Sequence, residues 1–61
     1  MNAEFIGNTS MGFVKGKIYN LDSKIQKIGS DLCICLYDKN SNVWCPYKNI
    51  DVILKNWRIF Q

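Results

Sequence analysis

The fold of this chain is decided by the stretch CICLYDKNSNVWCPY, which runs from Cys33 to Tyr47. Its two flanks are apolar and aromatic, and the residues between them, DKNSN, favour turns. Within each flank the side chains alternate with a period of two, so successive side chains lie on opposite faces of a strand. The stretch therefore predicts a β-hairpin, but apolar side chains occupy both of its faces, where a hairpin commonly leaves one face to water.

The register of this hairpin follows from the length of its loop. If residues 39–42 form the loop, Tyr37 lies opposite Trp44 and Leu36 lies opposite Cys45, and opposed residues share a face. A change of one residue in the loop would turn Trp44 toward the core. We expect the core face to hold Leu32, Ile34, Leu36, Val43, Cys45 and Tyr47. The second face then holds Cys33, Cys35, Tyr37, Trp44 and Pro46.

The rest of the chain has the pattern of further short strands separated by turns. Tyr19 and Leu21 fall on one face of a second strand, and the polar residues 22–28 are a candidate extension of that strand through a bend. Residues 29–31 turn the chain. We expect strands at residues 3–6, 17–21, 32–37, 43–47 and 57–60.

After Tyr47 the apolar period changes to that of a helix. Asn49 is a suitable N-cap for a short helix. One helical stripe is formed by Ile50, Ile53, Leu54 and Trp57. Short strands, tight turns and one late helical segment predict a mostly β fold, a small five-stranded barrel in which residues 1–61 form a single domain.

Size and composition fit one small folded domain with few stabilising contacts to spare. The chain has 61 residues, of which 48% are hydrophobic and 21% charged. Its net charge of +3 is compatible with an anionic partner but too weak to indicate a nucleic-acid binder. The lysines form no run, and we interpret them as solubilising surface charge.

The cysteines do not indicate a disulfide or a metal site. Cys33 and Cys35 alternate on one strand, a poor geometry for a disulfide, and the chain has no His to complete a zinc site. We interpret all three cysteines as small buried or half-buried hydrophobes in a reduced cytosolic protein, and expect no metal or cofactor. No signal-peptide pattern is present, and no apolar run reaches the roughly 18 residues of a membrane span, so we expect no membrane partner.

Catalysis is not expected from these residues. There is no His for acid–base chemistry, and the acidic residues are single and mostly located in turns. No activating base accompanies a cysteine, and no phosphate-binding loop or nucleotide-binding glycine pattern occurs.

Three segments carry a resemblance that covers nearly the whole chain: FIGNTSMGFVKGKIYNL, ICLYD and WCPYKNIDVILKNW. The chain resembles short hypothetical proteins of Gram-positive phages and prophages, which look like miniature barrels of the Src-homology-3 type. The motifs are structural glycines and core aromatics, so the resemblance implies a fold and says little about chemistry. It also implies that the protein acts in the host cytoplasm, where some tiny phage proteins of such architecture are host-takeover or anti-defence factors.

The apolar second face of the hairpin leaves three alternatives open. The C-terminal segment, through Trp57 or Phe60, covers it; or a second copy of the chain covers it; or it binds a ligand or partner. Tyr, Trp and Pro together are the composition with which grooves recognise extended peptides or flat rings. Self-association would supply apolar burial that so small a core lacks, so a homo-oligomer is expected.

Six residues are the candidate binding site. Arg58 is the only arginine, and its planar fork either holds a phosphate or carboxylate or simply solubilises an edge strand. The asparagines either satisfy turns and caps or offer hydrogen bonds to a base edge. The predicted ligand- or partner-binding residues are Tyr37, Trp44, Pro46, Asn42, Lys48 and Arg58.

Together these observations predict a non-catalytic binding protein. Its expected partner, besides itself, is a small nucleotide-derived immune signal or a host defence protein that it sequesters. The alternative is a module that binds single-stranded nucleic acid by aromatic stacking flanked by lysines. A third reading is a purely structural phage component.

Overall fold

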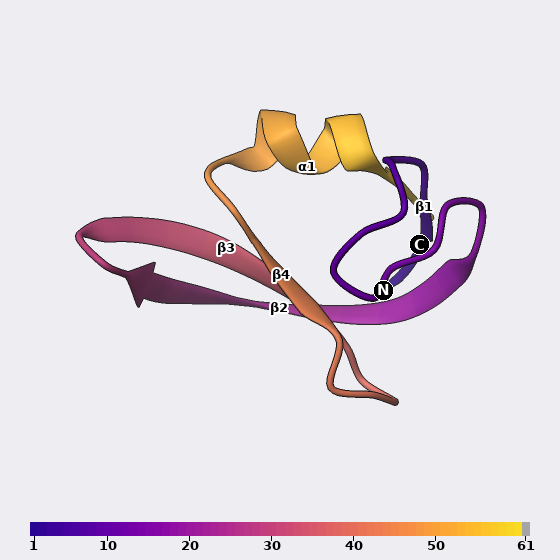
Figure 1. Cartoon of the computed structure of the whole chain (residues 1–61), viewed down its shortest axis with the longest axis horizontal. Coiled ribbons are helices and arrows are strands. Elements are labelled where there is room, and N and C mark those ends of the chain that lie inside the picture. Colours follow the sequence, from indigo (N-terminus) through magenta and orange to yellow (C-terminus); the bar gives the residue numbers. More distant parts are fainter. Residues whose placement is uncertain (61) are drawn as a thin grey trace.

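The computed structural model describes residues 1–60 of the chain. Its elements, in chain order, are β1 (Asn2–Phe5), β2 (Ile18–Ile28), β3 (Asp31–Asp38), β4 (Trp44–Tyr47), α1 (Ile50–Asn56) and β5 (Trp57–Ile59) (Figure 1). The strands form one antiparallel sheet in the order β4-β3-β2-β1-β5. The predicted mostly β fold, with five strands and one short helix near the C-terminus, is confirmed.

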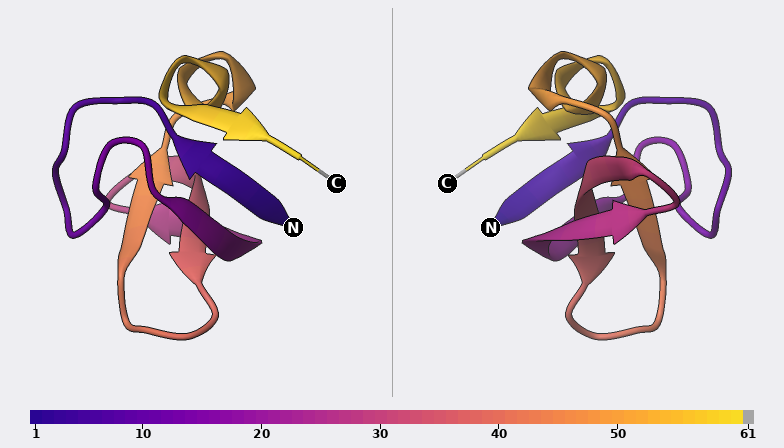
Figure 2. Two further views of the ribbon diagram at one scale, coloured as in Figure 1. Left: turned by 90° about the vertical axis from the view of Figure 1, so that its right-hand side faces the viewer. Right: turned by 90° about the vertical axis from the view of Figure 1, so that its left-hand side faces the viewer.

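β2 joins the two halves of the sheet. Its first residues, Ile18 to Asn20, pair with β1, and the rest of the strand, from Leu21 to Ile28, pairs residue by residue with β3. The candidate extension over residues 22–28 is therefore strand, and Gly29, at φ 62°, makes the tight return into β3. The sheet bends along β2, so that β1 and β5 lie across from the β3–β4 half (Figure 2).

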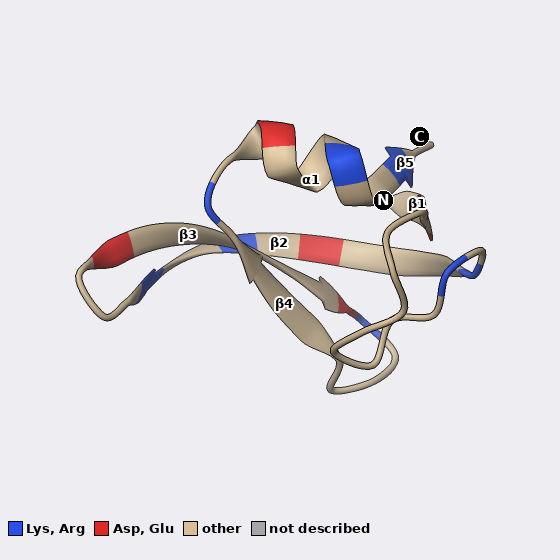
Figure 3. Cartoon of the chain, turned by 45° about the horizontal axis from the view of Figure 1, so that its top comes forward, with Lys and Arg blue, Asp and Glu red and all other residues tan. Residues whose placement is uncertain are grey.

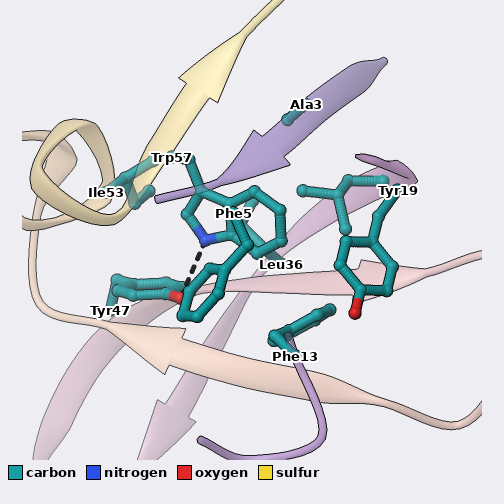
Figure 4. Packing of buried hydrophobic residues seen from close by; sticks show 9 residues of the cluster. Ala3, Phe5, Phe13, Tyr19, Leu36, Tyr47, Ile53 and Trp57 are labelled. Carbon is teal, nitrogen blue, oxygen red and sulfur yellow. Dashed lines mark hydrogen bonds between the residues drawn. The ribbon is translucent and has the colours of Figure 1, made fainter. Parts of the chain in front are cut away.

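The core between these halves is largely aromatic. Trp57 is at its centre, and its ring lies 4.9 Å from those of Phe5 and Phe13 and 5.8 Å from that of Tyr19, measured between centroids. Edge-on contacts of this kind add to the stability that burial alone supplies. The buried indole N–H of Trp57 donates a hydrogen bond of 2.8 Å to the hydroxyl of Tyr47 (Figure 4).

The long connection between β1 and β2 closes one side of this core. Phe13 is buried there, and its backbone exchanges two hydrogen bonds with that of Ser10 across a tight turn. Met11 and Gly12 occupy the turn with φ of 55° and 89°. The hydroxyl of Tyr19 accepts the backbone N–H of Val14 at 2.9 Å, which holds the end of the loop against β2.

α1 begins at the predicted N-cap, but it buries less of its apolar stripe than the sequence predicts. The side chain of Asn49 accepts the N–H of Val52 at 3.0 Å, which confirms it as the N-cap. Ile53 is buried, whereas Ile50 and Leu54 are exposed, because the helix packs against β4 and β5 along a narrow side only. Trp57 is the C-cap and the first residue of β5, so the predicted stripe is divided between two elements. No helix within residues 1–60 has the length and apolar character required to cross a membrane.

The predicted register of the β3–β4 hairpin is confirmed, including the loop over residues 39–42. Tyr37 pairs with Trp44, Leu36 with Cys45, and the backbone N–H of Asp38 donates to Val43 at 3.0 Å. The expected core face is only partly buried. The expectation that Leu32 is buried is wrong: it is 69% exposed, because the tip of the β2–β3 hairpin extends past α1 (Figure 1).

Candidate functional site

The second face of the hairpin is extended by β2 into a surface three strands wide. In register across β2, β3 and β4, one row is Asp22, Tyr37 and Trp44, and the next is Lys24, Cys35 and Pro46. Gln26 follows beside Cys33 on the first two strands. Paired residues share a face, so these side chains form one surface on the side of the sheet away from the core, called the outer face below.

A groove of about 420 Å³ lies on the outer face. It is lined by Lys24, Gln26, Tyr37, Ser41, Asn42 and Trp44. We call it the Tyr37–Trp44 groove. Its volume falls within the range of sites that hold small molecules, roughly 300 to 1,000 Å³.

Cys35 shows that the outer face is packed and not merely exposed. Its side chain points away from the core, yet it is 0% exposed, because its neighbours in register, Lys24 and Pro46, flank it on both sides. Its Sγ lies 3.9 Å from Oε1 of Gln26 and donates to that oxygen. The burial of this cysteine, and the half-burial of Cys33 and Cys45, agree with their interpretation as small hydrophobes.

The two aromatic side chains of the groove are available to a ligand. Trp44 is 45% exposed and Tyr37 is half-buried. They do not stack on each other, since the aromatic ring pairs within residues 1–60 all belong to the core. The Nζ atom of Lys24 lies 5.8 Å from the centroid of the Tyr37 ring, which gives this wall of the groove a positive charge.

Asp22 lies beside the hydroxyl end of Tyr37. The backbone N–H of Ser23 donates to the Asp22 carboxylate at 2.9 Å and, with a further hydrogen bond to Tyr37 and the charges of Lys39 and the N-terminus, lowers the pKa of Asp22. Burial, followed by the charge of Asp22 and the hydrogen bond to it, raises the pKa of Tyr37. Tyr37 therefore stays a neutral hydroxyl beside an ionised carboxylate at neutral pH.

The loop that bounds the groove is held by its own side chains. Ser41 donates from its hydroxyl to Oδ2 of Asp38 at 3.0 Å and accepts the N–H of Val43 at 3.3 Å. The N–H of Asn40 donates to the other carboxylate oxygen of Asp38 at 3.2 Å. The amide of Asn42 makes no hydrogen bond to any part of the chain from 1 to 60, so of the two loop residues that line the groove, Asn42 is the one with a free polar group for a ligand.

Of the six predicted site residues, the structure brings three together in the groove: Tyr37, Trp44 and Asn42. Pro46 lies on the same face but outside the groove, in the edge strand β4. It sits at a position between the hydrogen-bonded pairs of the ladder, where the missing N–H would point away from β3, so the ring is tolerated there. Lys48 is exposed beyond the end of β4.

Arg58 is far from the groove along the sheet. It lies in β5, at the opposite edge from β4, and its guanidinium forms an ion pair of 2.6 Å with Glu4. The arginine side chain is 65% exposed, and its guanidinium carbon lies 5.8 Å from the centre of the Phe60 ring. The basic residues as a whole are spread over several strands, α1 and the loops (Figure 3).

Sequence reasoning missed the contributions of Lys24, Gln26 and Ser41. The first two alternate along β2 with a period of two, the same signal that identified the outer face of β3 and β4. That signal carries weight only once residues 22–28 are known to be strand. Ser41 was visible only as one member of a turn-forming cluster.

The described C-terminal segment does not cover the outer face. Trp57 is buried in the core on the other side of the sheet, and β5, followed by Phe60, pairs along β1. Of the three alternatives for the outer face, coverage by Trp57 or Phe60 is therefore wrong. No three His, Cys, Asp or Glu side chains in the described part of the chain gather closely enough to hold a metal ion.

Comparison with known proteins identifies no relative. The chain matches no protein-family model, and neither a curated protein nor a solved structure is similar to it at a significant level.

Proposed function

We propose that this protein is a non-catalytic binding protein that captures a small, flat-ringed ligand of the nucleotide type in the Tyr37–Trp44 groove. The observation that supports this most strongly is that two aromatic side chains at paired strand positions border an open groove beside a single lysine. Stacking of a base on an aromatic side chain contributes about 1–3 kcal/mol and needs no particular base.

The side chains of the groove favour binding over bond-making. They supply two rings, one ammonium group, two amides and two hydroxyls, those of Ser41 and Tyr37. The hydroxyl of Ser41 is already engaged with Asp38 and Val43. The groups that remain can stack, donate hydrogen bonds and neutralise charge, which are the tasks of a site that holds a ligand.

The biological setting of the proposal comes from the resemblance to short phage proteins. In that setting the protein is a host-takeover or anti-defence factor in the host cytoplasm, and it sequesters a nucleotide-derived immune signal. A host defence protein is the other target of this class, and an exposed Trp beside Tyr is also a frequent anchor in protein interfaces.

Calorimetric titration of the pure protein with a panel of nucleotides tests the small-molecule proposal. Trp44→Ala removes an exposed ring, so it should leave the fold intact and weaken binding by roughly 5- to 150-fold, the equivalent of about 1–3 kcal/mol. Phe60→Ala is the matched control, because it removes another partly exposed aromatic outside the groove.

Equal affinities of wild type and Trp44→Ala for a bound nucleotide would place the site elsewhere. Absence of heat with every nucleotide, together with a stable protein captured by wild type and not by Trp44→Ala, would favour the host-protein target over a nucleotide.

Single-stranded nucleic acid is the second candidate ligand. Tyr37 and Trp44 beside Lys24 form the combination of rings and positive charge that such proteins use. This function predicts that affinity rises with oligonucleotide length and falls steeply with salt. Affinity for a strand that does not exceed that for its single nucleotide would exclude it.

A further inference from the structure

We infer that the ligand of the Tyr37–Trp44 groove carries one phosphate group, held by Lys24 and Gln26, while its ring lies against Trp44. This inference rests on the proposed function and makes it more specific. It assigns a direction to the groove and a charge to the ligand.

The groove has two chemically different ends. Trp44, Ser41 and Asn42 come from β4 and the loop before it, whereas Lys24 and Gln26 come from β2. Trp44 is in register with Asp22, so Lys24 lies two residues and Gln26 four residues farther along the strands. At about 3.3 Å per residue these offsets are roughly 7 and 13 Å, in addition to the width of the two strand spacings. At the backbone the ring site and the charged site are thus separated along the groove, and the Lys24 side chain extends from its site toward the Tyr37 ring.

The β2 end of the groove presents hydrogen-bond donors. The ammonium group of Lys24 has three donors and no acceptor, and the ion pair formed within residues 1–60 joins Arg58 to Glu4 instead. The Oε1 atom of Gln26 already accepts from Cys35, which directs the unbonded amide NH₂ group to the ligand. A cation next to amide donors favours an anionic oxygen cluster such as phosphate.

The charge balance of the outer face limits the ligand to one such group. Among the described residues, Lys24 is the single cationic side chain that lines the groove. Asp22 lies in the adjacent row and brings a negative charge beside Tyr37, while Arg58 is engaged at the other edge of the sheet. Further phosphates would meet the Asp22 carboxylate, and the cations that act on it, Lys39 and the N-terminus, are outside the lining of the groove.

The opposite end suits the ring. Trp44 has the exposed face required for stacking, and Asn42 beside it has a free amide with both a donor and an acceptor for a ring edge. An amide of this kind can pair with several bases, so the inference specifies the charge of the ligand and leaves the base open.

The test compares nucleosides, 5′-monophosphates and 5′-triphosphates of adenosine and uridine by calorimetric titration. We expect the monophosphates to bind at least about tenfold more tightly than the nucleosides, and the triphosphates to bind no more tightly than the monophosphates. Because salt screens an exposed ion pair, the affinity of the monophosphates should fall between about 50 and 200 mM salt, whereas that of the nucleosides should not.

Lys24→Gln should remove both the preference for phosphate and the salt dependence of monophosphate binding, whereas Lys24→Arg should keep them. Lys27→Gln is the matched control, because Lys27 pairs with Leu32 and so lies on the other face of the same strand. Lys24 and Lys27 are both exposed, so their substitution tests the effect of charge and not of folding.

Two sets of results separate this inference from the proposed function. Nucleosides that bind as tightly as monophosphates, triphosphates that bind most tightly, or Lys24→Gln without effect would each overturn the single-phosphate inference while the groove remained the binding site. If neither nucleosides nor nucleotides bind, the proposed nucleotide-type function is itself wrong, and the inference is overturned with it.

Discussion

The indole N–H of Trp57 and the hydroxyl of Tyr47 join the C-terminal strand to the hairpin inside the core. Both residues are buried, and no buried side-chain nitrogen or oxygen within residues 1–60 lacks a hydrogen-bond partner. In a core made mainly of rings, this contact sets which way the central indole points. Trp57 and Tyr47 therefore contribute to the stability of the fold without taking part in the groove.

Tyr47→Phe should lower the free energy of unfolding by about 1–3 kcal/mol, because it leaves the indole N–H of Trp57 buried without an acceptor. Urea denaturation measures this directly. Tyr37→Phe removes the same group from the outer face, where solvent can replace it, and should cost much less. If the two variants lose equal stability, the buried hydrogen bond does not have the role assigned to it.

Stability should also fall in alkaline solution through Tyr47. Burial, opposed by the hydrogen bond from Trp57, raises the pKa of Tyr47 to about 12, whereas tyrosine in an unfolded chain titrates near 10. The fold thus favours the neutral hydroxyl, so its contribution is complete below pH 10 and is lost as the pH rises toward 12. Thermal unfolding followed across this range should show a loss in wild type that Tyr47→Phe lacks; identical profiles would contradict it.

At the scale of elements, tight turns determine where strands can begin and end. The four-residue loop of the β3–β4 hairpin fixes which side chains reach the outer face. The long connection between β1 and β2 is held against the sheet by Phe13, and it returns through Gly12 and Gly16 at φ of 89° and 88°. These two glycines have nearly the same backbone and different surroundings.

Gly12→Ala should therefore destabilise the protein more than Gly16→Ala. Both substitutions force a side chain into the left-handed region at a cost of about 1–2 kcal/mol. A Cβ at Gly12 would lie 2.9 Å from Cγ1 of Val43, whereas a Cβ at Gly16 would meet nothing within 4 Å. We expect an additional loss of about 1–3 kcal/mol for Gly12→Ala from this overpacking, measured by denaturation. Equal losses would show that the loop moves away from Val43 freely.

For the molecule as a whole, the limit is the amount of apolar surface that 61 residues can bury. The core is complete around Trp57, yet aliphatic side chains remain outside it on the projecting hairpin and on α1: Ile25, Leu32, Ile50 and Leu54. A small domain gains stability when a second copy covers such residues. If the predicted homo-oligomer forms through these side chains, the groove on the outer face stays open.

We expect the thermal midpoint and the sedimentation mass of the wild-type protein to rise with protein concentration. Leu32→Lys should abolish this dependence, because it places a charge on the projecting hairpin. Val14→Lys is the control, since Val14 is an exposed aliphatic residue in the β1–β2 connection. A wild-type protein that sediments as a monomer at all concentrations would exclude the homo-oligomer.

Much of the fold was readable from the residues because the signals are short in range. Alternation in β3 and β4, the turn cluster between them and the cap at Asn49 each act within a few residues, and the structure has them as predicted. The pair of Tyr37 and Trp44 followed from the same local register. Boundaries shifted by about one residue at most of the strands, since fraying ends carry weak signals.

By itself, then, the sequence determined a five-stranded fold, the register of its central hairpin and a surplus aromatic face. Only the tertiary structure decided what lies beside that face, because this depends on contacts between residues distant in the chain. It placed Trp57 in the core, paired Arg58 with Glu4 and brought Lys24 next to Tyr37. The local alternation of residues specifies the face on which a side chain lies, but the folded sheet specifies which residues it contacts.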